Sequence, residues 1–132
     1  MPLMSFRFDK VIRHKMLSVM RASGAEVHTK VLDQEGYSLY LMKKLMEEAA
    51  EVAAVQNPEE LREELADVLE VMHSIISHHG LSMESIEIER LKKREAKGSF
   101  SPESYVDYVT LAEDHPLTSY YLTRPHQYPK VA

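Results

Sequence analysis

The sequence predicts an all-α protein in which amphipathic helices form a bundle within a single domain. Apolar residues recur at helical spacing along four stretches, and these stretches are bounded by Gly residues or by an Asn-Pro pair. At 132 residues the chain is long enough for one hydrophobic core but not for two. We therefore expect one domain over residues 1–132, with its core at about 8–100 and an irregular, aromatic and Pro-rich extension over 101–132.

The four predicted helices are bounded by residues that favour helix starts and ends. Asp33 or Ser38 could cap the second helix, and Asn57 could cap the third, with Pro58 in its first turn. Ser82 could cap the fourth helix, although a Ser also stands where a full capping box has Glu or Gln. The predicted helices cover residues 8–20, 35–55, 58–79 and 83–97.

The remaining segments carry weaker patterns. Residues 26–32 alternate between apolar and polar positions and could form a short extended piece. The sequence Ser-Pro-Glu at 101–103 could start a short helix that runs through Ala112. Beyond Pro116 we expect an ordered but irregular tail, because this segment holds too many Tyr residues for typical disorder.

Composition and charge argue against several classes of protein. The net charge is −5, whereas a protein that binds bulk nucleic acid needs a basic surface. The chain has no Cys, so disulfides and thiolate metal sites are excluded. No apolar run approaches the ~20 residues that span a bilayer, and the N-terminus lacks the apolar core of a signal peptide. We expect a cytoplasmic protein that binds neither a membrane nor a nucleic-acid polymer.

Acidic residues are concentrated on the second and third predicted helices. Residues three apart lie on one side of a helix, so Glu48 and Glu51 project together, as do Glu64 and Asp67. Both pairs interrupt stripes of Leu and Val, where a carboxylate is costly to bury unless it is paired or binds a metal. A second group of acids lies near the start of the third helix and suits the helix dipole: Glu59, Glu60 and Glu63.

The first group of acids offers only oxygen ligands, which favours a hard cation, Mg²⁺ or Mn²⁺, over zinc or copper. Mg²⁺ is usually held by a few carboxylates, with waters and substrate phosphates completing its shell, so the pattern favours a polyphosphate substrate. Basic residues should then lie nearby to neutralise the phosphates, although each of them could equally be an ordinary surface residue. The residues that we expect to bind phosphate are Lys44, Arg13, Lys15, Lys93 and Arg94.

The order and spacing of the motifs resemble those of a known family. The chain carries KVIRHKM at 10–16, KKLMEEAAEV at 43–52, EELADVLEVMHSI at 63–75 and a basic KKREAKGSF at 92–100. Together these motifs resemble the MazG-like, all-α nucleoside triphosphate pyrophosphohydrolases, in the branch related to phosphoribosyl-ATP pyrophosphohydrolase. The resemblance covers residues from about 10 to 100 and implies a MazG-like helical bundle.

The resemblance also implies an activity. Family members hydrolyse the bond between the α- and β-phosphates of a nucleoside triphosphate or related nucleotide, releasing a nucleoside monophosphate and pyrophosphate, and house-cleaning of unusual nucleotides is one expected role. Glu48, Glu51, Glu64 and Asp67 match the family's metal ligands, and Glu47 matches an accessory acid. A carboxylate at the metal site, either Glu47 or Glu51, would take the proton of the attacking water, while Lys or Arg would stabilise the departing pyrophosphate.

Two other interpretations stay open at this point. A carboxylate-bridged di-iron bundle needs Glu-x-x-His motifs, and one occurs at Glu70–His73. However, His73 projects to the side opposite Glu64, which argues against a shared site. The other alternative is a helical interaction module, although Met at helical spacing is more often core. Its Met-rich faces would include Met42, Met46, Met72 and Met83.

The number and length of the predicted helices also bear on assembly. Two long antiparallel helices and a shorter pair do not close a hydrophobic core alone. We therefore expect a homodimer or a higher homo-oligomer, in which the bundle is completed across the interface. Members of the family that the sequence resembles also assemble as dimers or larger.

Overall fold

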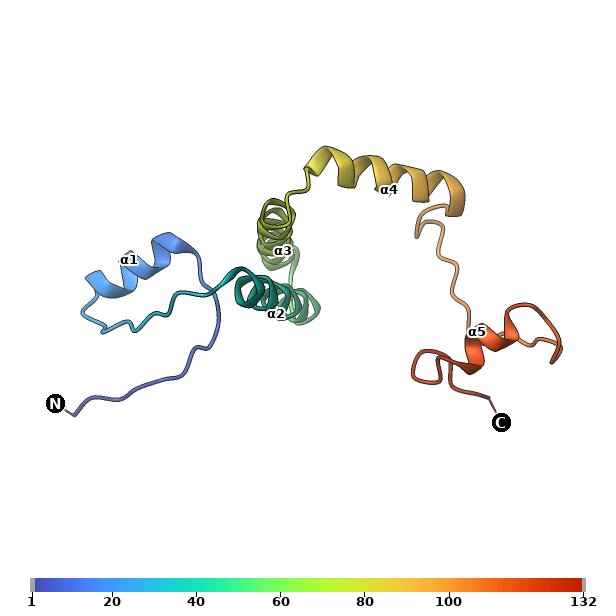
Figure 1. Ribbon diagram of the computed structural model, residues 1–132, viewed down its shortest axis with the longest axis horizontal. Helices are drawn as coiled ribbons and strands as arrows, with labels where there is room; N and C mark the ends of the chain where they lie inside the picture. Colours follow the sequence, from blue (N-terminus) through green and yellow to red (C-terminus); the bar gives the residue numbers. More distant parts are fainter. Residues whose placement is uncertain (1, 132) are drawn as a thin grey trace. The chain divides into compact units, whose positions relative to one another are not determined.

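Five helices account for the regular secondary structure of residues 2–131, which are the residues that the computed structural model describes (Figure 1). They are α1 (His14–Ala22), α2 (Gln34–Ala53), α3 (Pro58–His78), α4 (Met83–Lys97) and α5 (Thr118–Leu122). No strand occurs in this part of the chain, so the predicted all-α fold class is confirmed. No helix among these residues is both long enough and apolar enough to cross a membrane. The chain divides into two units, and the boundary falls at Arg90, within α4.

The caps of α2 and α3 are residues that the sequence predicts. Asp33 Oδ1 accepts a hydrogen bond from the backbone N–H of Gly36 at 2.7 Å. Asn57 Oδ1 accepts one from the backbone N–H of Glu60 at 2.9 Å, and Pro58 occupies the first turn. Each cap satisfies a backbone N–H that has no partner within its own helix.

The start of α4 has more hydrogen bonds between side chains and backbone than the sequence predicts. Ser82 Oγ accepts a hydrogen bond from the backbone N–H of Ser85 at 3.1 Å, as expected of a cap. In return, Ser85 Oγ accepts from the backbone N–H of Ser82 at 3.4 Å and donates to the Ser82 carbonyl at 2.8 Å. Ser85 therefore makes the reciprocal contact that Glu or Gln makes in a full capping box.

The first predicted helix begins later than expected. The sequence pattern places its start at Phe8, but α1 begins at His14, and residues 8–13 have no regular structure. Asp9 adopts a φ of 48°, in the left-handed region, and Arg13 is extended; neither conformation continues a right-handed helix. Residues 26–32 likewise form no strand.

The segment after α4 differs from the prediction in two places. The short helix expected up to Ala112 is absent: residues 101–112 contain no helical stretch. Several of these residues are aromatic or β-branched and solvent-exposed, such as Tyr105 and Val106, so they combine low helix propensity with no surface to pack on. Conversely, α5 forms inside the tail that the sequence predicts to be irregular.

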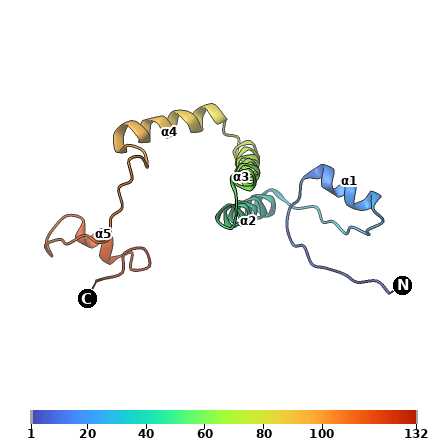
Figure 2. The same ribbon diagram turned by 180° about the vertical axis from the view of Figure 1, so that it is seen from behind.

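The helices α2 and α3 pack against each other as an antiparallel hairpin, joined by the turn at residues 54–57 (Figures 1 and 2). The rings of Tyr37 and His78 meet edge to face near the open end of this hairpin, with centroids 4.8 Å apart. Among the described residues, the buried apolar side chains belong to this helix pair and are Leu41, Val71 and Ile76.

Candidate metal and phosphate site

Four carboxylates meet between α2 and α3. Glu48 and Glu51 project from α2, and Glu64 and Asp67 project from α3. One carboxylate oxygen from each residue lies within 4.8 Å of the corresponding oxygens of the other three. The helical hairpin thus brings together the four acids that the sequence predicts as metal ligands. These four acids are called the acidic cluster below.

The burial of the acidic cluster leaves carboxylate oxygens without partners. Glu48 is buried, with 7% of its surface exposed, and Glu64 is half-buried. The Oε2 atoms of both residues are buried and have no hydrogen-bond partner. Burial raises the pKa of the Glu48 carboxyl, and the nearby charge of Glu51 raises it further. Buried charges are normally paired or bound to a metal, so these unpartnered oxygens fit a cation held between the helices.

The donor set of the acidic cluster suits a divalent hard cation. It consists of carboxylates alone, and the grouping includes no His or Cys from residues 2–131. Carboxylate oxygens are the ligands that Mg²⁺, Mn²⁺ and Ca²⁺ prefer, whereas zinc and copper sites normally include His or Cys. Two acids come from each helix, so an ion held by the cluster would bind both helices.

Three basic side chains contact this site. Lys44 Nζ lies 3.3 Å from Glu47 Oε2 and 3.5 Å from Glu48 Oε1, and its side chain is mostly buried. Arg13 Nη2 donates a hydrogen bond to Asp67 Oδ1 at 2.7 Å. Lys10, which the sequence analysis did not single out, donates from Nζ to Glu47 Oε1 at 2.9 Å. The three cations reduce the repulsion among the acids, and each keeps further N–H donors.

Comparison with known proteins identifies the family of this chain. The sequence profile of one family, described as phosphoribosyl-ATP pyrophosphohydrolase, matches residues 7–95, which is more than half of the chain. The chain belongs to the phosphoribosyl-ATP pyrophosphohydrolase family. The predicted family resemblance is thereby confirmed. Separate comparisons with curated proteins and with solved structures found no match.

Membership of the phosphoribosyl-ATP pyrophosphohydrolase family establishes the kind of chemistry. The chain is a pyrophosphohydrolase, a hydrolase that acts on acid anhydrides, and the family implies activity on a nucleotide. The family also implies a divalent metal, and the acidic cluster could bind one. The matched residues include the acidic cluster and the three basic residues that contact the site.

Glu47 differs from its neighbour Glu48 in environment and in charge state. It lies outside the acidic cluster and is held by two ammonium groups, those of Lys10 and Lys44. The hydrogen bond from Lys10 lowers the pKa of the Glu47 carboxyl, and the charge of Lys44 lowers it further. In return, the bond to Glu47 raises the pKa of Lys10. Neighbouring carboxyls of this pyrophosphohydrolase therefore have pKa values shifted in opposite directions.

The other predicted phosphate-binding residues lie apart from these contacts. Lys15 is exposed in the first turns of α1. Lys93 and Arg94 are exposed towards the C-terminal end of α4, where basic residues also suit the helix dipole. None of these three forms an ion pair with a described residue. Their role in binding phosphate stays a prediction.

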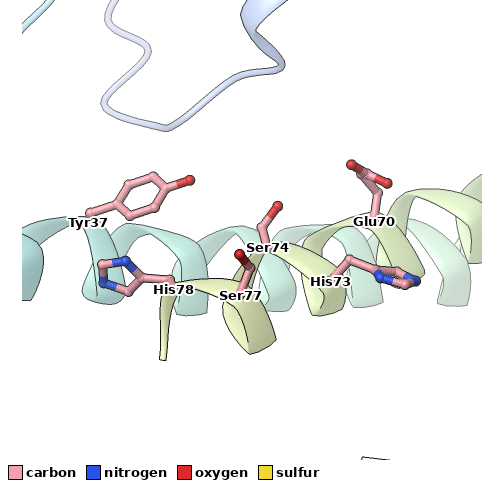
Figure 3. A pocket seen from close by; sticks show the side chains of 6 residues that line it. All are labelled: Tyr37, Glu70, His73, Ser74, Ser77 and His78. Carbon is pink, nitrogen blue, oxygen red and sulfur yellow. The ribbon is translucent and has the colours of Figure 1, made fainter. Parts of the chain in front are cut away.

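A polar groove of about 460 Å³ runs along a different stripe of α3 (Figure 3). Tyr37 of α2 lines one end, and Glu70 and His73 of α3 line the other, with serine hydroxyls between them. The Glu70–His73 pair thus lies in the groove and outside the acidic cluster. The arrangement gives no support to the di-iron alternative, which requires His beside the carboxylates.

Proposed function

We propose that this pyrophosphohydrolase cleaves the α–β bond of a nucleoside triphosphate or related nucleotide, with Mg²⁺ as its natural ion and Mn²⁺ as a substitute. The observation that carries the proposal is the acidic cluster with its unpartnered buried oxygens, bordered by three cations. Carboxylates in contact with ammonium and guanidinium groups suit a ligand that combines a divalent ion with phosphates.

The proposed ligands of the ion are Glu48, Glu51, Glu64 and Asp67. When bound, a divalent ion neutralises phosphate oxygens, orients them and lowers the pKa of the attacking water. The remaining work falls to side chains of the chain. Lys44 binds phosphate oxygens and stabilises the charge that develops on the departing pyrophosphate, and Arg13 binds phosphate oxygens. Lys15, Lys93 and Arg94 are further proposed phosphate contacts.

The reaction consumes one water and requires a proton acceptor. The water oxygen forms a bond to phosphorus, the P–O bond of the α–β bridge breaks, and nucleoside monophosphate and pyrophosphate leave. The proton passes to a carboxylate, either Glu47 or Glu51. Glu47 is held outside the acidic cluster by two lysines, whereas Glu51 belongs to the cluster.

Matched variants distinguish the two carboxylates. If Glu47 accepts the proton, Glu47→Gln lowers kcat by roughly a hundredfold or more while Mn²⁺ binding, followed by electron paramagnetic resonance, stays normal. If Glu51 accepts it, Glu47→Gln has a small effect on kcat. Glu51→Gln, by contrast, lowers both kcat and Mn²⁺ affinity, because Glu51 is also a proposed ligand.

A substrate panel tests the proposed function. The purified protein is incubated with Mg²⁺ and common or modified nucleoside triphosphates, together with phosphoribosyl-ATP, and pyrophosphate release is measured. We expect release from at least one of them, and none after removal of divalent ions with EDTA. A folded protein that binds Mn²⁺ but releases no pyrophosphate from any nucleotide would contradict the proposal.

We also propose that the active form is a homodimer or larger. The support is the small buried core of the described chain, set against long apolar faces that stay exposed on both paired helices. On α2 the exposed face includes Leu39 and Met46, and on α3 it includes Leu65 and Leu69. Four helices from two copies could bury these faces together.

Two further expectations from the sequence complete the proposal. We propose that residues 1–132 work as one domain whose catalytic core extends over about 8–100, and the family match over 7–95 supports this. A cytoplasmic location stays a prediction.

A further inference from the structure

The chain before α1 reaches the acidic cluster without forming a helix. Residues 9–13, called the N-terminal strap below, contact both paired helices through side chains. Lys10 bonds to Glu47 on α2, and Arg13 bonds to Asp67 on α3. The strap thus places one cation beside each of the two helices that carry the acids.

One hydrogen bond fixes the beginning of the strap. The hydroxyl of Tyr40, on α2, donates to Asp9 Oδ1 at 2.7 Å. Asp9 adopts a left-handed φ of 48°, and the chain bends at the next residue, Lys10. Asp is among the residues that tolerate this conformation. Two side chains further along the strap, Val11 and Ile12, are half-buried.

The two strap cations keep donors for a ligand. Arg13 uses Nη2 on Asp67, and its side chain stays 57% exposed. Lys10 uses one donor on Glu47 and is 41% exposed. A guanidinium has five N–H donors and an ammonium three, so both can bind phosphate oxygens while they hold the carboxylates.

We propose that Tyr40 and Asp9 are positioning residues whose hydrogen bond holds the N-terminal strap in place, so that Lys10 and Arg13 bind the phosphates of the nucleotide. This inference rests on the proposed function and adds Lys10 to the phosphate site. Tyr40 acts through the strap, because its hydroxyl is engaged by Asp9. The same hydrogen bond raises the pKa of Tyr40, as expected for a phenol that donates to a carboxylate.

The first experiment tests whether the Tyr40–Asp9 hydrogen bond holds the strap in place, and it does not depend on catalysis. Trypsin cleavage after Arg13 is followed by mass spectrometry under native conditions. Tyr40→Phe removes the hydroxyl and keeps the ring, so we expect initial cleavage about fivefold faster than in the wild type. Tyr37→Phe is the matched control, since this tyrosine lies one turn away on α2 and makes no bond to the strap. Equal cleavage rates in Tyr40→Phe and Tyr37→Phe would overturn the proposed role of Tyr40.

Variants of Asp9 test the other partner of the bond. Asp9→Asn keeps an oxygen acceptor and a residue that tolerates left-handed backbone, so we expect cleavage near the wild-type rate. Asp9→Ala loses both and should be cleaved about as fast as Tyr40→Phe. If Asp9→Asn and Asp9→Ala are cleaved equally fast, the hydrogen bond does not hold the strap.

The phosphate role is tested with inorganic pyrophosphate as the probe. Pyrophosphate with Mg²⁺ should slow cleavage after Arg13 in the wild-type protein by about threefold, because a bound anion engages the strap cations. Cleavage that is unchanged by magnesium pyrophosphate would overturn the phosphate role, whether or not the protein hydrolyses nucleotides.

Kinetics then connects the strap with turnover. With an active nucleotide, Tyr40→Phe should raise KM about fivefold and leave kcat within about twofold, because the strap contacts phosphates in substrate and transition state alike. A loosened strap with unchanged KM would overturn the inference. A wild-type protein that hydrolyses no nucleotide contradicts the proposed function instead, while the cleavage results still decide on the hydrogen bond.

Discussion

At the scale of single residues, Glu48 shows how the site balances stability against binding. Its carboxylate is buried next to other acids, one of its oxygens has no partner, and Lys44 provides a cation 3.5 Å away. Burial and the charge of Glu51 raise the pKa of Glu48, so the metal-free fold disfavours the ionised form. A bound cation would reverse this preference. Binding and stability should therefore respond in opposite directions to the loss of this charge.

Glu48→Gln tests this balance. Without metal, the variant should be more stable than the wild type at neutral pH, by about 1 kcal/mol, because a buried charge is replaced by a neutral amide. With Mg²⁺, the wild type should gain stability and the variant should not. Thermal unfolding followed by circular dichroism, with EDTA or Mg²⁺, gives both values. Glu63→Gln, at an exposed position of α3, is the control and should change neither.

The difference in the free energy of unfolding between Glu48→Gln and the wild type should depend on pH in a definite direction. A raised carboxyl pKa means that the folded state binds the proton more tightly than the unfolded chain does. The protonated Glu48 carboxyl therefore contributes to stability at low pH. This contribution is lost as the pH rises from about 4.3, the ordinary pKa of Glu, through the raised pKa of the folded state. Without metal, we expect the free energy of unfolding of Glu48→Gln to exceed that of the wild type by an amount that grows as the pH rises across this window. A constant difference from pH 4 to 7 would contradict the burial of this charge.

At the scale of elements, local sequence determines the helices because their signals act over one or two turns. The limits of α4 agree with the prediction, those of α2 and α3 differ by at most two residues, and the predicted caps Asp33 and Asn57 make the expected bonds. The start of α1 could not be predicted in this way. The apolar pattern continues back to Phe8, whereas the strap follows contacts to residues far away in the sequence.

Asn57→Ala tests the importance of the cap that joins the two acidic helices. Loss of the bond to the Glu60 N–H should lower the free energy of unfolding by about 1 kcal/mol, as measured by urea denaturation. Asn57→Asp keeps an acceptor at the helix start and should be close to the wild type. Equal destabilisation by Ala and Asp would show that the cap contributes little.

The tail is an element that the family match does not include, since the match ends at residue 95. If the catalytic core ends near residue 100, a chain shortened after Glu103 should keep helicity, Mn²⁺ binding and turnover within about threefold of the full chain. Circular dichroism, electron paramagnetic resonance and pyrophosphate release measure these three properties. Loss of Mn²⁺ binding on truncation would show that the tail is part of the core.

At the scale of the whole molecule, the paired helices α2 and α3 keep large apolar side chains exposed to solvent. The few side chains that are buried among residues 2–131 form a small core for that length of chain, and Met46 is 72% exposed. Long apolar faces on a helix pair normally pack against other helices. Assembly with a second copy would provide those helices.

Met46→Glu tests this assembly. A charge placed on the exposed face of α2 should shift the protein from dimer to monomer, or raise the dissociation constant at least tenfold, as measured by analytical ultracentrifugation over a range of concentrations. Met46→Leu keeps the position apolar and should remain dimeric. A wild-type protein that stays monomeric at high concentration would contradict the proposed dimer.

The sequence by itself determined the helical class, most helix limits and the pairing of acids on two consecutive helices. These features follow from periodicity and capping, which depend on neighbours three or four residues away. Only the tertiary structure decided that Lys10 reaches Glu47 and that Arg13 reaches Asp67, across 37 and 54 residues of sequence. It also decided which oxygens of Glu48 and Glu64 are buried without a partner. Such contacts depend on the path of a non-helical segment and on the packing of two helices, which no local pattern specifies.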